Sequence, residues 1–209
     1  MTSSRLPNHI SQQFDNELED IRSKVLAMGG LIEQHLAKVL AYFSKGEVEG
    51  VEYVAVSDYL VNALEVEIDN DCTDILARRQ PAAGDLRLVL AVSKTITDLE
   101  RMGDEAEKIA RLILHEDDIL VAGSYYHGAA TLGKHVASMV RSSLDAFARM
   151  DSEAAFKVAF EDREIDAETG AIMRQLMTYM MEDPMTISPC LDTILAVRAL
   201  ERIGDHANN

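Results

Sequence analysis

The stretch Leu99-Glu100-Arg101-Met102-Gly103-Asp104 decides the fold, because it returns almost unchanged as Leu200-Glu201-Arg202-Ile203-Gly204-Asp205. The two copies lie 101 residues apart in a chain of 209. A motif that recurs at about half the chain length indicates a tandem duplication, with one unit of roughly one hundred residues in each half.

The repeated motif carries two acidic side chains. Side chains four residues apart lie one above the other on a helix, so Glu100 stacks with Asp104, and Glu201 stacks with Asp205. Two carboxylates in this position repel each other and weaken an isolated helix. A destabilising pair that is present in both halves suggests a cation or a partner that uses it.

Composition favours a helical protein with a sizeable core. Hydrophobic residues make up 47% of the chain, and it has four prolines, ten methionines and no tryptophan. Abundant Ala, Leu and Glu with so few prolines are typical of an all-α protein. The net charge of −16 opposes binding to nucleic acid and to anionic lipid headgroups.

The N-terminal residues show no apolar signal-peptide core, and the apolar runs are too short to span a bilayer. The two cysteines, Cys72 and Cys190, have no metal-type spacing and are expected to be buried free thiols. We therefore expect a soluble, cytoplasmic protein without direct membrane insertion.

Helical periodicity and turn residues predict six long helices. Gly46, Pro81, Gly123 and Pro184 mark the breaks between apolar stripes of helical spacing. The expected helices are 11–44, 47–79, 83–115, 126–150, 152–182 and 188 onward. The sixth is still in progress at Asn209, so we expect it to be incomplete.

The duplication extends through the whole pattern. An offset of 104 maps Met28 to Leu132 and Val61 to Ile165, and it preserves the apolar stripe along the first two helices of each half. The fold class predicted is all-α, a tandem duplication of two antiparallel three-helix bundles. The expected domains are residues 1–116 and 125–209, joined by a linker at 117–124.

The antiparallel topology aligns further oxygen-bearing side chains with the motifs. In a hairpin of two helices, residues at one level have numbers with a constant sum, and a turn at Pro81 pairs Asp58 with Asp104 and Asn62 with Glu100. The equivalent pairing in the second half joins Asp162 with Asp205 and Asp166 with Glu201, around a turn at 183–184.

Four such side chains at one level suit a hard cation such as Mg, Mn, Ca or oxidised Fe. The eight candidate ligands are Asp58, Asn62, Glu100, Asp104, Asp162, Asp166, Glu201 and Asp205. The competing interpretation is a solvated surface whose carboxylates pair with Arg101, Lys108, Arg198 and Arg202. Because Asn62 carries no charge, we expect the second site to bind a cation better than the first.

Other chemistries find little support. No Glu is followed three residues later by His, which argues against a ferritin-like di-iron centre. The chain has no nucleophile elbow, P-loop or dinucleotide-binding glycine motif. His206 stands beside Asp205 and is a candidate for supporting a metal ligand rather than for catalysis.

These motifs together resemble the PhoU family, accessory proteins of phosphate-specific transport. The resemblance rests on both copies of L-E-R-[MI]-G-D, on 77–89 with Ala77-Arg78-Arg79-Gln80-Pro81, and on 174–183, and it covers residues 8–209. The chain departs from the family pattern at Asn62, where a carboxylate is usual, and at its end, where family members continue the last helix.

The resemblance implies a non-enzymatic regulator. Family members are paired three-helix bundles that commonly form homodimers, and some carry multinuclear Fe or Zn on their E-x-x-x-D faces. They act at the cytoplasmic side of the Pst phosphate ABC transporter and its partner sensor kinase PhoR. There they hold off the phosphate-starvation response, the Pho regulon, while phosphate is plentiful.

Two alternatives remain open from the residues alone. One is a metal-dependent enzyme with bridging carboxylates, which needs an open coordination position and a general base. The other is a purely structural helical bundle, which gives no reason for matched carboxylates in both halves.

Overall fold

The computed structural model describes residues 12–115 and 126–209. Its elements are α1 (Gln12–Lys45), α2 (Val51–Arg79), α3 (Ala83–His115), α4 (Tyr126–Arg149), α5 (Ser152–Glu182), the 3-10 turn η1 (Pro184–Thr186) and α6 (Ile187–Asn208). No strand occurs within these two ranges. The expected linker at 117–124 and its two domain boundaries lie outside the described residues.

Local residues explain where the helices begin and end. Gly46 and Gly50 both have positive φ, 71° and 89°, so α1 ends at Lys45 and α2 begins only at Val51 instead of the predicted 47. Asp151 precedes α5 and accepts hydrogen bonds from the backbone N–H groups of Glu153 and Ala154.

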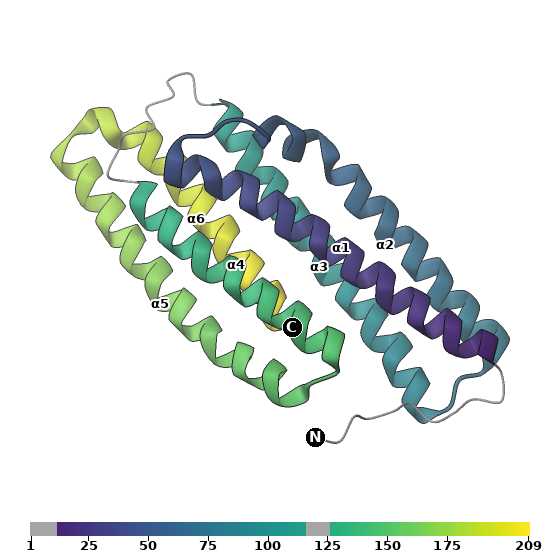
Figure 1. Cartoon of the computed structure of the whole chain (residues 1–209). Coiled ribbons are helices and arrows are strands. Elements are labelled where there is room, and N and C mark those ends of the chain that lie inside the picture. Colours follow the sequence, from purple (N-terminus) through teal and green to yellow (C-terminus); the bar gives the residue numbers. More distant parts are fainter. Residues whose placement is uncertain (1–11, 116–125) are drawn as a thin grey trace.

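The six helices form two antiparallel three-helix bundles that lie side by side (Figure 1). The bundles meet along two pairs of helices, α1 against α4 and α3 against α6. α2 and α5 therefore form the two outer edges of the molecule (Figure 1). The predicted all-α fold with a tandem duplication is confirmed.

Each bundle encloses the apolar stripe that the repeat predicts. Val61 of α2 and its equivalent Ile165 of α5 are both buried, as are Met28 of α1 and Leu132 of α4. The two halves therefore bury the same positions, and the hydrophobic effect stabilises both in the same way.

The contact between α1 and α4 is reciprocal. Gly29 of α1 faces Leu144 of α4, whereas Leu40 of α1 faces Gly133 of α4. An added Cβ would lie 2.5 Å from Leu144 Cδ2 at Gly29 and 2.0 Å from Leu40 Cδ2 at Gly133. Since the offset of 104 converts one pair into the other, the bundles pack as two equivalent halves related by a pseudo-twofold axis.

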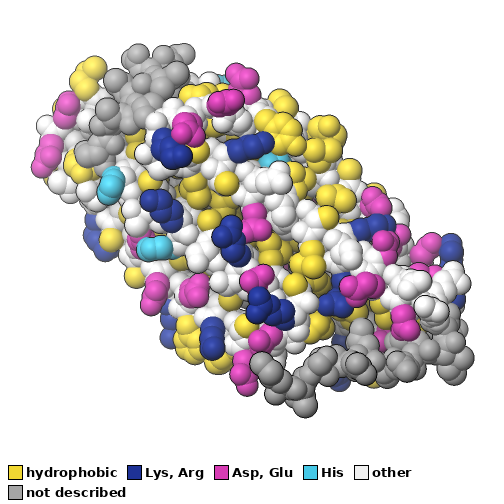
Figure 2. Space-filling view, viewed as in Figure 1, with side chains coloured by type: hydrophobic (Ala, Val, Ile, Leu, Met, Phe, Trp, Pro, Cys, Tyr) yellow, Lys and Arg dark blue, Asp and Glu magenta, His cyan; other side chains and the backbone are white. Residues whose placement is uncertain are grey.

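Acidic and basic side chains alternate over the face that α1 and α4 present (Figure 2). One ion pair on this side crosses between the bundles, from Arg141 Nε of α4 to Glu33 Oε1 of α1 at 2.9 Å. None of the described helices is long and apolar enough to cross a membrane.

Candidate functional site

The first carboxylate cluster lies between α2 and α3. Asp58 is buried on α2, and Asn62 one turn later donates from Nδ2 to Asp58 Oδ2 at 2.9 Å. Glu100 and Asp104 of α3 are half-buried beside them. The structure thus brings all four predicted residues of the first half together.

The carboxyl groups of the first cluster raise one another's pKa values. Burial, followed by the charges of Asp104 and Glu107, raises the pKa of Asp58 above its ordinary 3.8. Burial, followed by the charges of Asp104, Glu65 and Asp58, raises the pKa of Glu100 above 4.5. Both causes disfavour the ionised form, so each carboxylate here costs free energy when charged.

The second cluster lies at the equivalent place between α5 and α6. Burial, followed by the charges of Asp162, Glu201 and Asp166, raises the pKa of Asp205. Burial and the charge of Asp166 raise the pKa of Asp162. The charges of the predicted residues of the second half thus act on Asp162 and Asp205, in a more open setting, since Asp166 and Asp205 are exposed.

Of the basic side chains expected to neutralise the two clusters, only Arg198 pairs with a candidate ligand among the described residues. Among the described residues, one ion pair involves the eight candidates, from Arg198 Nη1 to Glu201 Oε2 at 2.7 Å. Lys108 and Arg202 instead contact Glu105, and Arg101 lies 3.9 Å from Asp98. The interpretation as a solvated, ion-paired surface fits Glu201, which has an ion-pair partner. It does not explain the other candidate carboxylates, which have none among the described residues.

The oxygen atoms of the clusters are of the type that binds a hard cation, but their arrangement supports such a site only in part. Asp58 Oδ1, Asn62 Oδ1 and Asp162 Oδ1 are buried without a hydrogen-bond partner. A buried oxygen without a partner is costly, and metal coordination is one way to satisfy it. However, no three or more His, Cys, Asp or Glu within residues 12–115 and 126–209 are arranged to hold one metal ion.

Two further carboxylates, which the sequence pattern did not predict, lie near the first cluster. Glu65 and Glu107 continue the helical spacing of 58–62 and 100–104, and their charges act on Glu100 and Asp58. Glu107 is paired with Arg111 at 2.7 Å, so it adds little net negative charge to the first cluster. The expectation that the second site binds a cation better than the first stays a prediction.

The glycine of each motif lets the neighbouring helix approach. A Cβ on Gly103 would lie 3.0 Å from Asp58 Oδ1 and 3.1 Å from Val61 Cγ1, both on α2. A Cβ on Gly204 would lie 3.3 Å from Ile165 Cδ1 on α5. Gly103 therefore places the α3 backbone directly against the Asp58 carboxylate.

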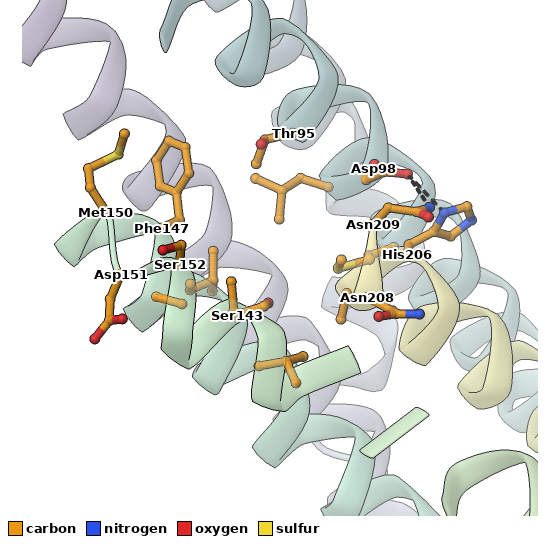
Figure 3. Close-up of a pocket in the computed structure, with 17 residues that line it drawn as sticks. Thr95, Asp98, Ser143, Phe147, Met150, Asp151, Ser152, His206, Asn208 and Asn209 are labelled. Carbon is orange, nitrogen blue, oxygen red and sulfur yellow. Dashed lines mark hydrogen bonds and ion pairs between the residues drawn. The ribbon is translucent and has the colours of Figure 1, made fainter. Parts of the chain in front are cut away.

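His206 does not point into the second cluster. Its Nδ1 lies 3.1 Å from Asp98 Oδ1 of α3, and Asn209 Nδ2 donates to the same oxygen at 3.2 Å (Figure 3). The contact joins the two bundles, and the charge of His206 also lowers the pKa of Asp205, so its supporting role beside Asp205 stays a prediction.

A hollow of about 350 Å³ lies beside this contact, where α3, α4, α5 and α6 meet (Figure 3). Its lining is mostly apolar and includes Leu144, Phe147 and Val158. Among the described lining residues, Ser143 Oγ donates to Val140 O at 2.9 Å and His206 contacts Asp98, so this hydroxyl and this imidazole are not paired with each other.

The family model described as "PhoU domain" matches residues 25–113 and 130–209. A phosphate-specific transport system accessory protein PhoU homolog of Pseudomonas putida is 48% identical over 98% of this chain and 80% of its own length. The accessory protein PhoU of Escherichia coli K12 is 44% identical over the full chain and 86% of its own length.

Solved structures agree over nearly the whole fold. The crystal structure of PhoU from Pseudomonas aeruginosa superposes with a TM-score of 0.88 at 46% identity, covering 94% of each chain. The phosphate transport system regulatory protein PhoU from Streptococcus pneumoniae has a TM-score of 0.84 at 28% identity, covering 94% of this chain and 92% of its own. The family model, the relatives that match at least 98% of the chain and the shared fold agree, so the chain belongs to the PhoU family.

Proposed function

We propose that this protein is a non-enzymatic cytoplasmic regulator of phosphate uptake and of the phosphate-starvation regulon. In this role it is an adaptor between the Pst phosphate ABC transporter and the PhoR sensor kinase. The observation that carries the proposal is similarity over at least 98% of the chain to proteins named accessory proteins of phosphate-specific transport.

The architecture supports an adaptor in physical terms. An adaptor that couples two partners needs two separate contact surfaces and different affinities for their states. Two packed bundles of 22- to 34-residue helices offer long, stiff faces on opposite sides of one molecule. A homodimer, also proposed here, doubles the number of such faces.

The two carboxylate clusters are proposed as cation sites that belong to this regulatory role. The candidate ligands are those of the first cluster (Asp58, Asn62, Glu100, Asp104) and of the second (Asp162, Asp166, Glu201, Asp205). The unpartnered buried oxygens and raised pKa values support this proposal. By ligand type and by the family resemblance, the cations to test are Fe, Zn, Mg and Mn.

One pair of measurements separates the regulator from its two alternatives. The protein is purified without chelator, its metal content is measured by mass spectrometry, and pull-downs use the transporter and the kinase cytoplasmic domains. A regulator binds the transporter or the kinase. A metal-dependent enzyme binds metal but neither partner, and a structural bundle binds none of them.

A further inference from the structure

Four cationic side chains surround a second hollow, of about 380 Å³, between α3 and α6. Lys108 and Arg111 extend from α3, and Arg198 and Arg202 extend from α6. This gathering is unusual in a chain whose net charge is −16. Its floor is apolar and consists of Leu112, Leu195 and Ala199.

The cations of this hollow lie above their carboxylate partners. Glu105 Oε1 accepts from Lys108 Nζ and from Arg202 Nη1, each at 2.8 Å, yet the Glu105 side chain is only 4% exposed. The Lys108 and Arg202 side chains are 52% and 56% exposed. Arg111 and Arg198 are similarly exposed over Glu107 and Glu201. A partner that approaches this surface therefore meets positive charge first.

An exposed apolar stripe on α6 leads into the hollow. Ile187, Leu191 and Leu195 follow one another at four-residue spacing and are 43%, 50% and 54% exposed. The same line along the helix continues to Arg198 and Arg202. From Ile187 to Arg202 it extends about 22 Å at 1.5 Å per residue, which is four turns of helix.

We propose that this surface, formed by Lys108, Arg111, Leu112, Leu191, Leu195, Arg198 and Arg202, binds an amphipathic helix of a partner protein. The helix carries Asp or Glu beside its apolar side chains. Leucines along a groove between two antiparallel helices accept the apolar face of a third helix. The outward cations complement acidic residues at its edge, which fixes orientation and speeds association.

The surface favours an acidic amphipathic helix over a small inorganic anion or an anionic membrane. The four cations already donate to Glu105, Glu107 and Glu201, and the apolar floor adds no hydrogen bond for a small inorganic anion, whereas it can bury the apolar side chains of a helix. The chain's net charge opposes approach to an anionic bilayer. This inference rests on the proposed adaptor function, because it identifies the surface through which one of the two partners is held.

The test measures the affinity of the full chain for the purified transporter and for the kinase cytoplasmic domain. Leu195→Glu should weaken binding to one of them at least about tenfold. Arg111→Gln/Arg198→Gln should also weaken binding and reduce its dependence on salt, because rim charges act through screened attraction.

Two control variants make the same kinds of substitution at exposed residues outside the proposed surface. Leu90→Glu replaces a leucine of α3 that is 49% exposed, and Arg78→Gln/Arg149→Gln removes two cations that are also paired one turn away. Both controls should bind within about twofold of wild type. Circular dichroism and thermal melts verify that every variant is folded.

The outcomes distinguish the two proposals. If wild type binds neither partner, the adaptor function and this inference both fail. If wild type binds but Leu195→Glu binds equally well, only the surface is wrong. The inference is also overturned if Leu195→Glu dissociates a homodimer in sedimentation, or if it abolishes binding to phosphatidylglycerol vesicles while partner binding is retained.

Discussion

Gly103 and Gly204 occupy the same position in the two copies of the motif, but their surroundings differ. Three neighbours, from α2 and α1, lie within 3.4 Å of a Cβ placed on Gly103, and one of them is the Asp58 carboxylate oxygen. Around Gly204 the nearest side-chain atom is the flexible Cδ1 of Ile165 at 3.3 Å. The helix contact beside the carboxylates is therefore tighter in the first bundle.

We expect opposite effects of alanine at these two glycines. Alanine stabilises a helix interior by about 1 kcal/mol relative to glycine. At Gly204 most of this gain should appear, whereas at Gly103 overpacking against Asp58 and Val61 should outweigh it by about 1 kcal/mol. Urea unfolding of both variants checks this, and equal stabilisation at both sites would contradict the tighter contact.

The Asp205 carboxylate is expected to lower stability when no cation is bound. Its pKa is raised by burial and by neighbouring carboxylates, so the native state binds its proton more readily than the unfolded state. Stability from this group therefore increases as pH falls from 7 through the raised pKa, and the increase is complete near the ordinary value of 3.8.

The substitution Asp205→Asn tests whether the ionised Asp205 carboxylate lowers stability. In chelator at pH 7 it should raise the free energy of unfolding by about 0.5 kcal/mol, since it removes a like-charge repulsion. The advantage over wild type should shrink as pH is lowered. With excess Mg, Mn, Fe or Zn, wild type should gain more in melting temperature than the variant. Equal melts with and without metal would leave the second cluster without a cation role.

At the scale of the helices, the sequence predicted more of the fold than of the site. Apolar periodicity and the glycine and proline breaks were sufficient for six helices, because a buried stripe and its interruptions depend on local sequence. The pairing of Asp58 with Asp104 across α2 and α3 was predicted from the position of the turn at Pro81. Glu65 and Glu107 were missed because only residues four apart were matched between the helices, although a further step of three residues keeps both on the same faces.

The cap of α5 gives an element-scale prediction. Asp151 Oδ1 accepts from the N–H groups of Glu153 and Ala154, each at 3.0 Å. Asp151→Ala should lower the free energy of unfolding by about 1 kcal/mol, whereas Asp151→Asn, which retains the capping oxygen, should change it by only a few tenths. Thermal melts of the two variants make the comparison, and an equal loss in both would show that the negative charge of Asp151, and not its capping hydrogen bonds, stabilises the helix.

At the scale of the whole molecule, the reciprocal contacts between α1 and α4 make the two bundles one unit. Gly29 with Leu144 and Gly133 with Leu40 are equivalent pairs, so the duplication was preserved in the interface as well as in each core. The sequence repeat predicted two similar bundles, but not which faces meet, because an interface between halves has no periodicity of its own.

Neighbouring glycines test the interface. At Gly30 a Cβ meets nothing within 4 Å, so Gly30→Ala should stabilise by about 0.5–1 kcal/mol. At Gly29 the added methyl group must displace Leu144, and Gly29→Ala should instead destabilise by about 1–2 kcal/mol. Chemical denaturation of both variants decides the point, and a stabilised Gly29→Ala would mean that α1 and α4 are loosely packed.

The proposed regulatory function requires this protein to hold off the phosphate-starvation response. The most direct measurement is a phosphate-starvation reporter in a strain that lacks this protein but retains the phosphate transporter, grown in phosphate-rich medium. We expect high expression in the deletion strain and low expression once the full chain is restored. Low expression in the deletion strain would contradict the regulatory function.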